Sequence, residues 1–262
     1  MTEKAKKPTY QVKVIGKTFR ILECLVQQAM GPTEISKKVE MHVSTVYRIL
    51  SNLQQAGYVV QSRPNGTFAL SLKVLKLSDA ALRQLDFRKE TFPFLKALSE
   101  RTRETVHMTV LEGTEVVYIE KCESSEPVAV HSRIGGRAPL HCTAVGKAIL
   151  AFLPEQAREE LLGRIELKKF TSNTITSRGA LKRELSAVQR QAYAMDDEEY
   201  REGIRCMGAP IFDYKGDVIA AFSITIPAAR FGHKRVSELA LLVQDTSRKI
   251  SGQLGYHEQE TH

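Results

Sequence analysis

Two short helical patterns with a four-residue connection between them place the strongest constraint on how this chain can fold. Ile35 and Val39 mark the first pattern. The second repeats apolar residues every three to four positions, at Val46, Ile49, Leu50 and Leu53. The connection consists only of Glu40-Met-His-Val43. Two helices joined by so tight a turn, the second with polar residues on its other face, indicate a helix-turn-helix motif.

The flanking residues extend this motif to a winged helix-turn-helix. Upstream, an earlier helix is predicted by one apolar face at Ile15, Phe19, Leu22 and Val26. Gly31-Pro32 interrupts that pattern, and Gly57 is placed to cap the third helix. Downstream, two β-prone runs flank the turn signal Arg63-Pro-Asn-Gly66. Three helices followed by a hairpin is the winged order, although a small helical domain without affinity for DNA remains an alternative.

Charge is concentrated in this first module. Residues 1–71 contain ten Lys and Arg against four Asp and Glu, whereas residues 72–262 contain 28 against 26. A basic module of this kind predicts a polyanion partner, with an ordinary solvated surface as the alternative. The expected base-reading residues are Val43, Ser44, Thr45, Tyr47 and Arg48. The expected backbone contacts are Lys17, Arg20, Lys37 and Lys38, with Arg63 at the tip of the wing.

The remainder of the chain reads as a linker and a second domain. We predict a disordered basic tail over residues 1–11, a DNA-binding domain over 12–71, a linker helix over 72–88 and an effector domain over 89–256. Strands are expected in the second domain at 106–111, 116–119, 128–130, 209–212 and 218–226. Helices are expected around Phe94, Leu95 and Leu98, at 144–152, from Pro154 onward and at about 235–253. Because strands and helices do not alternate regularly, the domain is expected to be α+β.

The composition indicates the compartment. No apolar run reaches the roughly 18 residues that a membrane span needs, and the first residues lack the apolar segment of a secretory signal. Four cysteines are widely spaced with no CxxC pair, which argues against disulfides or a zinc ribbon. We therefore expect a cytoplasmic protein with no membrane partner.

Several stretches imitate catalytic or cofactor motifs. Ala144-Val-Gly-Lys-Ala148 is similar to a phosphate-binding loop, but position 141 is His rather than Gly, and no Ser or Thr follows the Lys. Arg133-Ile-Gly-Gly-Arg137 does not fit the dinucleotide pattern, so no cofactor is expected. A Cys–His nucleophile pair or a metal site remains open for a last group, which consists of His141, Cys142, Cys206 and Asp196.

Taken together and in order, the motifs resemble the IclR family of bacterial transcriptional regulators over about residues 12–255. In the first domain the resemblance is carried by Thr33-Glu-Ile35, Val43-Ser-Thr-Val-Tyr-Arg-Ile-Leu50 and the stretch from Leu53 to Tyr58. In the second it is carried by Glu104-Thr-Val-His107, Ser132-Arg-Ile-Gly135, Thr143-Ala-Val-Gly-Lys-Ala148, Asp197-Glu-Glu199 and Gly203 to Asp213.

The resemblance implies a winged helix-turn-helix followed by a GAF-like effector domain. It also implies a homodimer, often joined into a dimer of dimers, that binds a pseudo-palindromic operator on double-stranded DNA. The effector of such a protein is a small organic acid. Carried over by motif, the effector site comprises Ala144, Val145, Asp196, Cys206, Ser223 and Thr225. Position 225 is commonly Ser in the family and position 136 is often Arg, so Thr225 and Gly136 depart from its pattern.

Within the family, the chain is most similar to the branch that regulates sugar-acid breakdown, which includes the 2-keto-3-deoxygluconate repressor. We therefore expect a transcriptional repressor, not an enzyme, controlled by a keto acid or sugar acid. Two other functions serve as alternatives. One is a metal-sensing regulator that uses His141, Cys142 or Cys206 with Asp196. The other is an enzyme with Cys206 as nucleophile and His141 as base.

Overall fold

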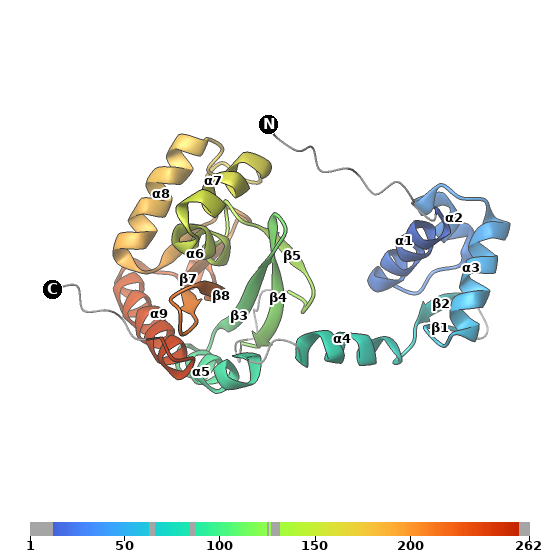
Figure 1. Cartoon of the computed structure of the whole chain (residues 1–262), viewed down its shortest axis with the longest axis horizontal. Coiled ribbons are helices and arrows are strands. Elements are labelled where there is room, and N and C mark those ends of the chain that lie inside the picture. The colour runs from blue at the N-terminus through green and yellow to red at the C-terminus, as the bar shows by residue number, and fades with distance from the viewer. Residues whose placement is uncertain (1–12, 63–65, 84–86, 125, 127–131, 257–262) are drawn as a thin grey trace. The chain divides into compact units, whose positions relative to one another are not determined.

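The computed structural model describes residues 13–62, 66–83, 87–124, 126 and 132–256. Contacts within the chain divide it into two compact units, residues 1–84 and 85–262 (Figure 1). Each unit contains its own cluster of buried apolar residues. The division falls inside the segment 72–88, for which a linker helix was predicted; in the structure one helix spans residues 74–83 and the next begins at residue 87.

The first unit has the predicted order of three helices and a hairpin. Its elements are α1 (Lys13–Gln27), α2 (Pro32–Val39), α3 (Val43–Gln55), β1 (Val59–Gln61), β2 (Phe68–Leu70) and α4 (Val74–Arg83). The two strands are antiparallel, with Val59 opposite Leu70. Gly57 has a φ of +80°, the left-handed conformation expected of a residue just past a helix end. The winged helix-turn-helix fold is therefore confirmed.

The apolar face predicted for α1 is not the face that packs on the other helices. Ile21 and Leu25 are buried in the core, whereas Ile15, Phe19 and Val26 are 52%, 60% and 56% exposed. Both sets repeat at helical spacing, so periodicity alone predicted the helix but not its orientation. Ile15, Phe19 and Val26, three large apolar side chains of α1, are therefore left on the surface of the first unit.

The second unit is built on one antiparallel sheet. Its strands are β3 (Thr105–Glu112), β4 (Glu115–Cys122), β5 (Arg137–Pro139), β6 (Ala194–Asp197), β7 (Ile204–Phe212) and β8 (Val218–Pro227), in the spatial order β5-β4-β3-β8-β7-β6. Its helices are α5 (Phe87–Thr102), α6 (Ala144–Phe152), α7 (Glu155–Arg164), α8 (Arg178–Gln191), the 3₁₀ turn η1 (Ala228–Arg230) and α9 (His233–Gln253). The predicted α+β class is confirmed.

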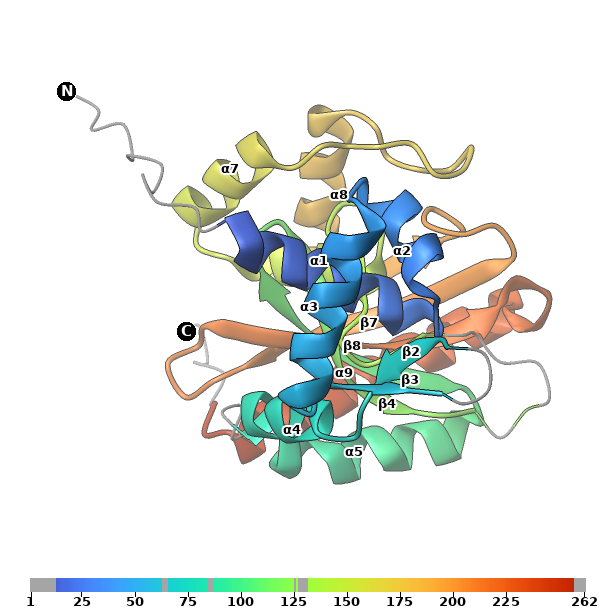
Figure 2. The ribbon, with the colours of Figure 1, turned by 90° about the vertical axis from the view of Figure 1, so that its right-hand side faces the viewer.

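Helices cover both faces of this sheet. Figure 2 shows α5 and α9 on one side and α7 and α8 on the other. On the first side, the Ser247 hydroxyl of α9 donates to the Pro210 carbonyl at 2.6 Å. On the second side, a Cβ added to Gly208 of β7 would lie 3.4 Å from the Cβ of Ala144. Ala144 at the start of α6 is therefore within van der Waals distance of position 208, where a side chain is excluded chiefly by the Phe222 carbonyl oxygen of β8, 2.6 Å from the added Cβ.

The predicted long strands and helices of this unit are present, but four elements were missed: β5, β6, α8 and the 3₁₀ turn η1. The short edge strands β5 and β6 were not predicted because each has only three or four residues, and β6 ends in two aspartates, which strands disfavour. Helix α8 was not predicted because few of its residues are apolar. The strand expected at 128–130 falls outside the described residues.

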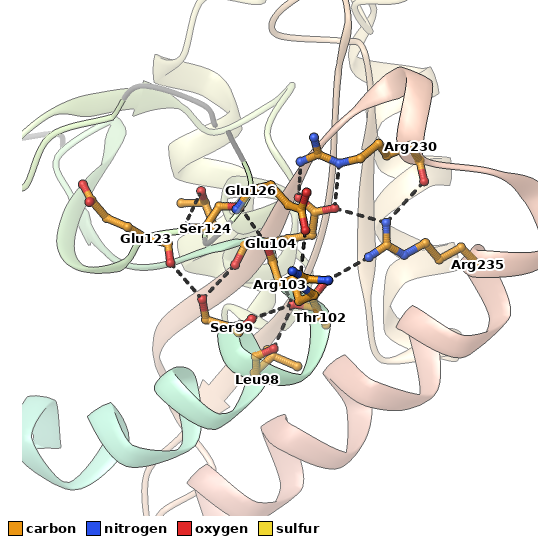
Figure 3. Close-up of polar contacts among 11 residues, drawn as sticks. Leu98, Ser99, Thr102, Arg103, Glu104, Glu123, Ser124, Glu126, Arg230 and Arg235 are labelled. Carbon is orange, nitrogen blue, oxygen red and sulfur yellow. Dashed lines mark hydrogen bonds and ion pairs between the residues drawn. The ribbon is translucent and has the colours of Figure 1, made fainter. Parts of the chain in front are cut away.

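A buried carboxylate fixes the start of β3 against the last third of the chain (Figure 3). Glu104 is 1% exposed, and its oxygens lie 2.6 Å from Arg230 Nη2 and 3.1 Å from Arg235 Nη1. Arg235 also donates to the Thr102 carbonyl at 3.0 Å. Charge-assisted hydrogen bonds of this kind are strong and directional, so β3 is held in register beside β8.

Within the described ranges, no helix combines the length and apolar composition that crossing a bilayer requires.

Candidate functional site

The turn between α2 and α3 sets the orientation of the predicted recognition helix. Glu40 adopts the left-handed conformation at the end of α2, with a φ of 52°. The Met41 amide then donates to the Ser36 carbonyl at 3.1 Å, and the Met41 side chain is buried. Helix α3 buries Val46, Ile49, Leu50 and Leu53 in the core. Its opposite face is thereby turned to solvent.

The residues expected to read bases lie on this outer face. Val43, Ser44, Tyr47 and Arg48 are exposed, and Thr45 is half-buried. The ring of Tyr47 packs edge-on against Phe68 of β2, with 6.3 Å between the ring centroids. The hairpin therefore supports one side of the outer face of α3.

The residues expected to contact the DNA backbone are also accessible. Arg20, Lys37 and Lys38 are exposed and Lys17 is half-buried. Lys37 and Lys38 lie in the last turn of α2, where the helix dipole also favours cations. No acidic side chain pairs with these lysines and arginines in the part of the first unit that the structure describes. Arg63, the expected wing-tip residue, lies outside the described residues.

Four of the six predicted effector residues, namely Asp196, Cys206, Ser223 and Thr225, lie on the adjacent strands β6, β7 and β8. Across β6, β7, β8 and β3, strand pairing places four polar residues opposite one another in turn: Asp196, Cys206, Thr225 and Thr105. Directly opposed residues in antiparallel strands share a face of the sheet, so these four form one line, which we call the polar row. Ser223 lies two residues from Thr225 and on the same face.

The start of α6 adjoins the same face of the sheet. Ser223 stands opposite Gly208, against which Ala144 packs. Thr143 caps the helix, with its hydroxyl accepting from the Gly146 amide at 3.1 Å. The first amides of a helix, here those of Ala144 and Val145, have no carbonyl partner inside the helix. This end of α6 also carries the positive pole of the helix dipole, which favours an anion.

Asp196 is a buried carboxyl group at one end of the polar row. Its Oδ1 accepts from the amides of Glu199 at 2.8 Å and Tyr200 at 3.3 Å. Burial raises the pKa of Asp196 to about 7, and nearby Glu199 adds to the increase, while the two amide bonds oppose it. The side chain can therefore carry a proton near neutral pH and act as donor as well as acceptor.

The Cys–His nucleophile pair considered from the sequence is not assembled. The Cys206 thiol lies 3.5 Å from the Thr225 hydroxyl, to which it donates. His141 Nε2 instead lies 3.0 Å from the Lys168 carbonyl. Burial raises the pKa of the Cys206 thiol well above its usual value, and the nearby Asp196 adds to this effect. A nucleophilic cysteine needs the opposite shift.

The metal-site alternative also lacks its geometry. Among the described residues, no three His, Cys, Asp or Glu side chains are placed to hold one metal ion. Burial likewise raises the pKa of Cys142, whereas a cysteine that binds metal does so as a thiolate.

One residue of this region was not singled out from the sequence. His107 of β3 stands opposite Ser223, and its Nδ1 lies 3.2 Å from the Thr225 hydroxyl. Its Nε2 forms a short hydrogen bond with the Ser132 hydroxyl. Burial, with a contribution from Lys121, lowers the pKa of His107 to about 3, so the ring is neutral. Its only signal in the sequence was membership of the motif Glu104-Thr-Val-His107.

The chain is similar to known proteins over nearly its whole length. Residues 14–63 match the family described as the IclR helix-turn-helix domain, and residues 79–252 match the C-terminal domain of bacterial transcriptional regulators of the IclR type. The HTH-type transcriptional regulator KdgR of Escherichia coli strain K12 is 39% identical over 248 residues, which cover 94% of each chain.

Solved structures agree with this similarity. The crystal structure of the Thermotoga maritima IclR protein superposes with a TM-score of 0.81 at 35% identity, covering 94% of this chain and 100% of that one. An IclR homologue from Microbacterium hydrocarbonoxydans, crystallised with 4-hydroxybenzoate, gives 0.78 at 25% identity, covering 92% and 98%. The chain belongs to the IclR family of bacterial transcriptional regulators.

Proposed function

We propose that this protein is a cytoplasmic transcriptional repressor that a small organic acid releases from its operator. The polar row beneath the start of α6 is the observation that carries the proposal. It offers hydroxyl, thiol and carboxyl groups on one side of the sheet, next to helix amides that suit a carboxylate. In this proposal the acid group lies at the amides of Ala144 and Val145.

The side chains of the polar row, together with Ser223, are proposed to recognise the rest of the acid. Ser223 and Thr225 project from one strand toward the same side, so their hydroxyls can contact neighbouring oxygens of one ligand. Cys206 and Asp196 extend the row toward β6. Several hydroxyl-binding groups in line suit a polyhydroxylated chain, and 39% identity with KdgR supports a keto acid or sugar acid.

DNA binding is assigned to the outer face of α3. Ser44, Thr45, Tyr47 and Arg48 reach base edges in this proposal, while Val43 contacts the methyl groups of thymine. Lys17, Arg20, Lys37 and Lys38 hold the phosphate backbone, and Arg63 is assigned to the wing contact. The assignment is supported by the accessibility of these residues, of which Lys17 and Thr45 are half-buried and the others exposed, apart from Arg63, which lies outside the described residues.

A homodimer is proposed, because one helix-turn-helix reads only half of a pseudo-palindromic operator. The exposed apolar residues of the first unit support this assembly. They lie on α1 at Val14, Ile15, Phe19 and Val26, and in or just before α4 at Leu72, Leu75 and Leu77. A dimer of dimers is proposed as the larger assembly.

The test begins with selection of operator DNA from a random library by the full-length protein. A transcription assay on a promoter carrying the selected operator is then titrated with 2-keto-3-deoxygluconate and, separately, with 4-hydroxybenzoate. We expect repression that the keto acid relieves. Activation, or repression that no keto or sugar acid in a wider panel relieves, would contradict the proposed sign or the proposed effector class.

A further inference from the structure

His107 joins the polar row to a second part of the unit. Its two ring nitrogens contact different segments: Nδ1 meets Thr225 on β8, and Nε2 meets Ser132, which precedes β5. The side chain is 3% exposed, so water has little access to replace either partner. A neutral imidazole has one donor nitrogen and one acceptor nitrogen, and the two partners together decide which is which.

The direction of each hydrogen bond in this chain follows from its first donor. The Cys206 thiol donates to the Thr225 oxygen. Thr225 then has its own O–H available to donate to Nδ1 of His107, which leaves the ring proton on Nε2, facing Ser132. The order Cys206, Thr225, His107, Ser132 is thus one continuous chain of donors and acceptors.

Ser132 belongs to a short segment that is attached to the sheet at both ends. At its far end, the Gly135 amide donates to the Tyr118 carbonyl at 2.7 Å, and the Tyr118 amide donates to the Gly136 carbonyl at 3.0 Å. At its near end, the bond from His107 and a 3.4 Å contact from Lys121 Nζ to the Ser132 carbonyl hold it. A Cβ at position 136 would approach the Arg133 carbonyl to 2.9 Å, so Gly136 is needed for this tight turn.

We propose that His107 is a positioning residue that transmits occupancy of the polar row to segment 132–136. This inference rests on the proposed effector site. An effector oxygen that accepts the Thr225 O–H, such as a keto or carboxylate oxygen, removes the donor to Nδ1. The tautomer equilibrium of the imidazole then shifts by exchange with solvent during transient opening of the site: the Nε2–H bond breaks and its proton leaves to water, and water supplies the proton that binds Nδ1. Nδ1–H then donates to the Thr225 oxygen, and Nε2 becomes an acceptor for the Ser132 O–H. The hydrogen bond at Ser132 reverses, although the effector does not touch that residue.

A purely structural role is the competing explanation. The ring of His107 packs edge-on against Tyr118, with 5.1 Å between centroids, and could serve only to fill space. In that case the protonated nitrogen would not depend on Thr225. The two explanations therefore differ in the tautomer of one imidazole, which can be measured directly.

The first experiment uses full-length protein labelled with ¹⁵N-histidine, without any ligand. His107→Asn identifies the resonances of this ring by their loss. We expect a neutral ring from pH 5 to pH 8 with its proton on Nε2, and a changed Nδ1 signal in Thr225→Val. Three results would overturn the proposed role of His107, whether or not any acid binds. They are a ring that is protonated at pH 6, a ring proton on Nδ1 rather than Nε2, and ring signals that do not change in Thr225→Val.

The second experiment adds 2-keto-3-deoxygluconate and follows amide hydrogen exchange in residues 132–136. In the wild type we expect at least a threefold change in exchange rate when calorimetry shows the site filled. The amide nitrogen of Asn in His107→Asn lies near the position of Nδ1, and that of Gln in His107→Gln lies near the position of Nε2. Neither variant can link Thr225 to Ser132, so both should lose the change in exchange rate when compared at equal ligand occupancy. Thr109→Val, on the same strand but bonded to the Ala221 carbonyl, is the control that keeps it.

The outcomes separate the two proposals. If either His107 variant keeps the ligand-induced change in amide exchange at residues 132–136, the proposed role of His107 is wrong, while the proposed effector site still stands. If calorimetry detects no binding of any keto or sugar acid to the wild type, the proposed effector class fails. The tautomer measurement in unliganded protein then still decides whether the hydrogen-bond chain exists.

Discussion

Lys147 and Glu199 form an ion pair of 2.5 Å between side chains that are 1% and 8% exposed. Glu184 provides a second carboxylate at 2.9 Å from the same ammonium group. Burial alone would lower the pKa of Lys147, but the two glutamates outweigh it and raise the pKa above its ordinary value. Lys147, which stands in the stretch that is similar to a phosphate-binding loop, therefore joins α6 to α8 through Glu184 and to the segment after β6 through Glu199.

Loss of this lysine should strongly destabilise the second unit. Lys147→Met leaves two carboxylates facing each other, one of them buried, without their cation. We expect a loss of about 3–5 kcal/mol in the free energy of unfolding, measured by urea denaturation. Lys182→Met is the matched control, because its 2.6 Å pair with Glu159 is half exposed and should be worth about 0–1 kcal/mol. Similar losses in both variants would refute the importance of burial here.

Asp196 should make stability depend on pH with an unusual sign. Its folded pKa of about 7 exceeds the ordinary 3.8, so between these values the folded state holds the extra proton. The free energy of unfolding contributed by Asp196 therefore falls as pH rises through this window, by at most about 1.4 kcal/mol per pH unit. Asp196→Asn should remove this contribution.

The measurement must compare the two proteins rather than examine the wild type alone. His107 has a lowered pKa of about 3, so its contribution rises with pH up to its ordinary value of 6.5 and opposes that of Asp196. Glu199 and Lys147 lie close to Asp196, and their charges respectively raise and lower its pKa. Urea denaturation from pH 4 to pH 8 should show the stability of the wild type falling relative to Asp196→Asn. A constant difference would show that Asp196 ionises normally.

The exposed apolar residues of the first unit predict how the chain assembles. Leu75 of α4 is 61% exposed, and Leu241 of α9 is 67% exposed. Leu75→Asp should weaken the proposed dimer by at least tenfold, because Leu75 has apolar neighbours in sequence that a partner would cover. Sedimentation velocity across a concentration series measures this. An equal effect of Leu241→Asp, or none of Leu75→Asp, would place the interface elsewhere.

Ser223 provides a test of the effector site. Ser223→Ala removes a hydroxyl proposed to bond the ligand, which should weaken binding of 2-keto-3-deoxygluconate by about 1–3 kcal/mol in calorimetry. Cys206→Ser keeps a small polar group that can still donate to Thr225, so its effect should be smaller. Operator affinity without the acid should barely change in either variant. The reverse order of the two effects would contradict the proposed roles.

The fold was largely predictable because its signals are local. The helical or strand periodicity of α3, α6 and the long strands appears within short stretches of sequence. The resemblance to a known family then gave the order of these elements in the fold. The sequence did not show which face of α1 is buried, since Ile15, which is exposed, and Ile21, which is buried, both fit a helical repeat. His107 was missed because its partners, Thr225 and Ser132, are 118 and 25 residues away along the chain. The pairing of β3 with β8 places His107 beside Thr225, and this register between strands cannot be predicted from residues that are neighbours in the sequence.

Recognition of DNA gives the last prediction. Arg48 and Lys37 are both exposed cations, on α3 and at the end of α2. An arginine that bonds a guanine edge discriminates between sequences, whereas a lysine on phosphate does not. Arg48→Ala should therefore cost about 1–3 kcal/mol on the selected operator and much less on random DNA. Lys37→Ala should weaken binding to both DNAs equally and reduce the salt dependence of binding by about one released counterion.

Fluorescence anisotropy at several salt concentrations separates these outcomes. Equal losses on both DNAs for Arg48→Ala would make Arg48 a phosphate contact, and base reading would then rest with Ser44, Thr45 and Tyr47.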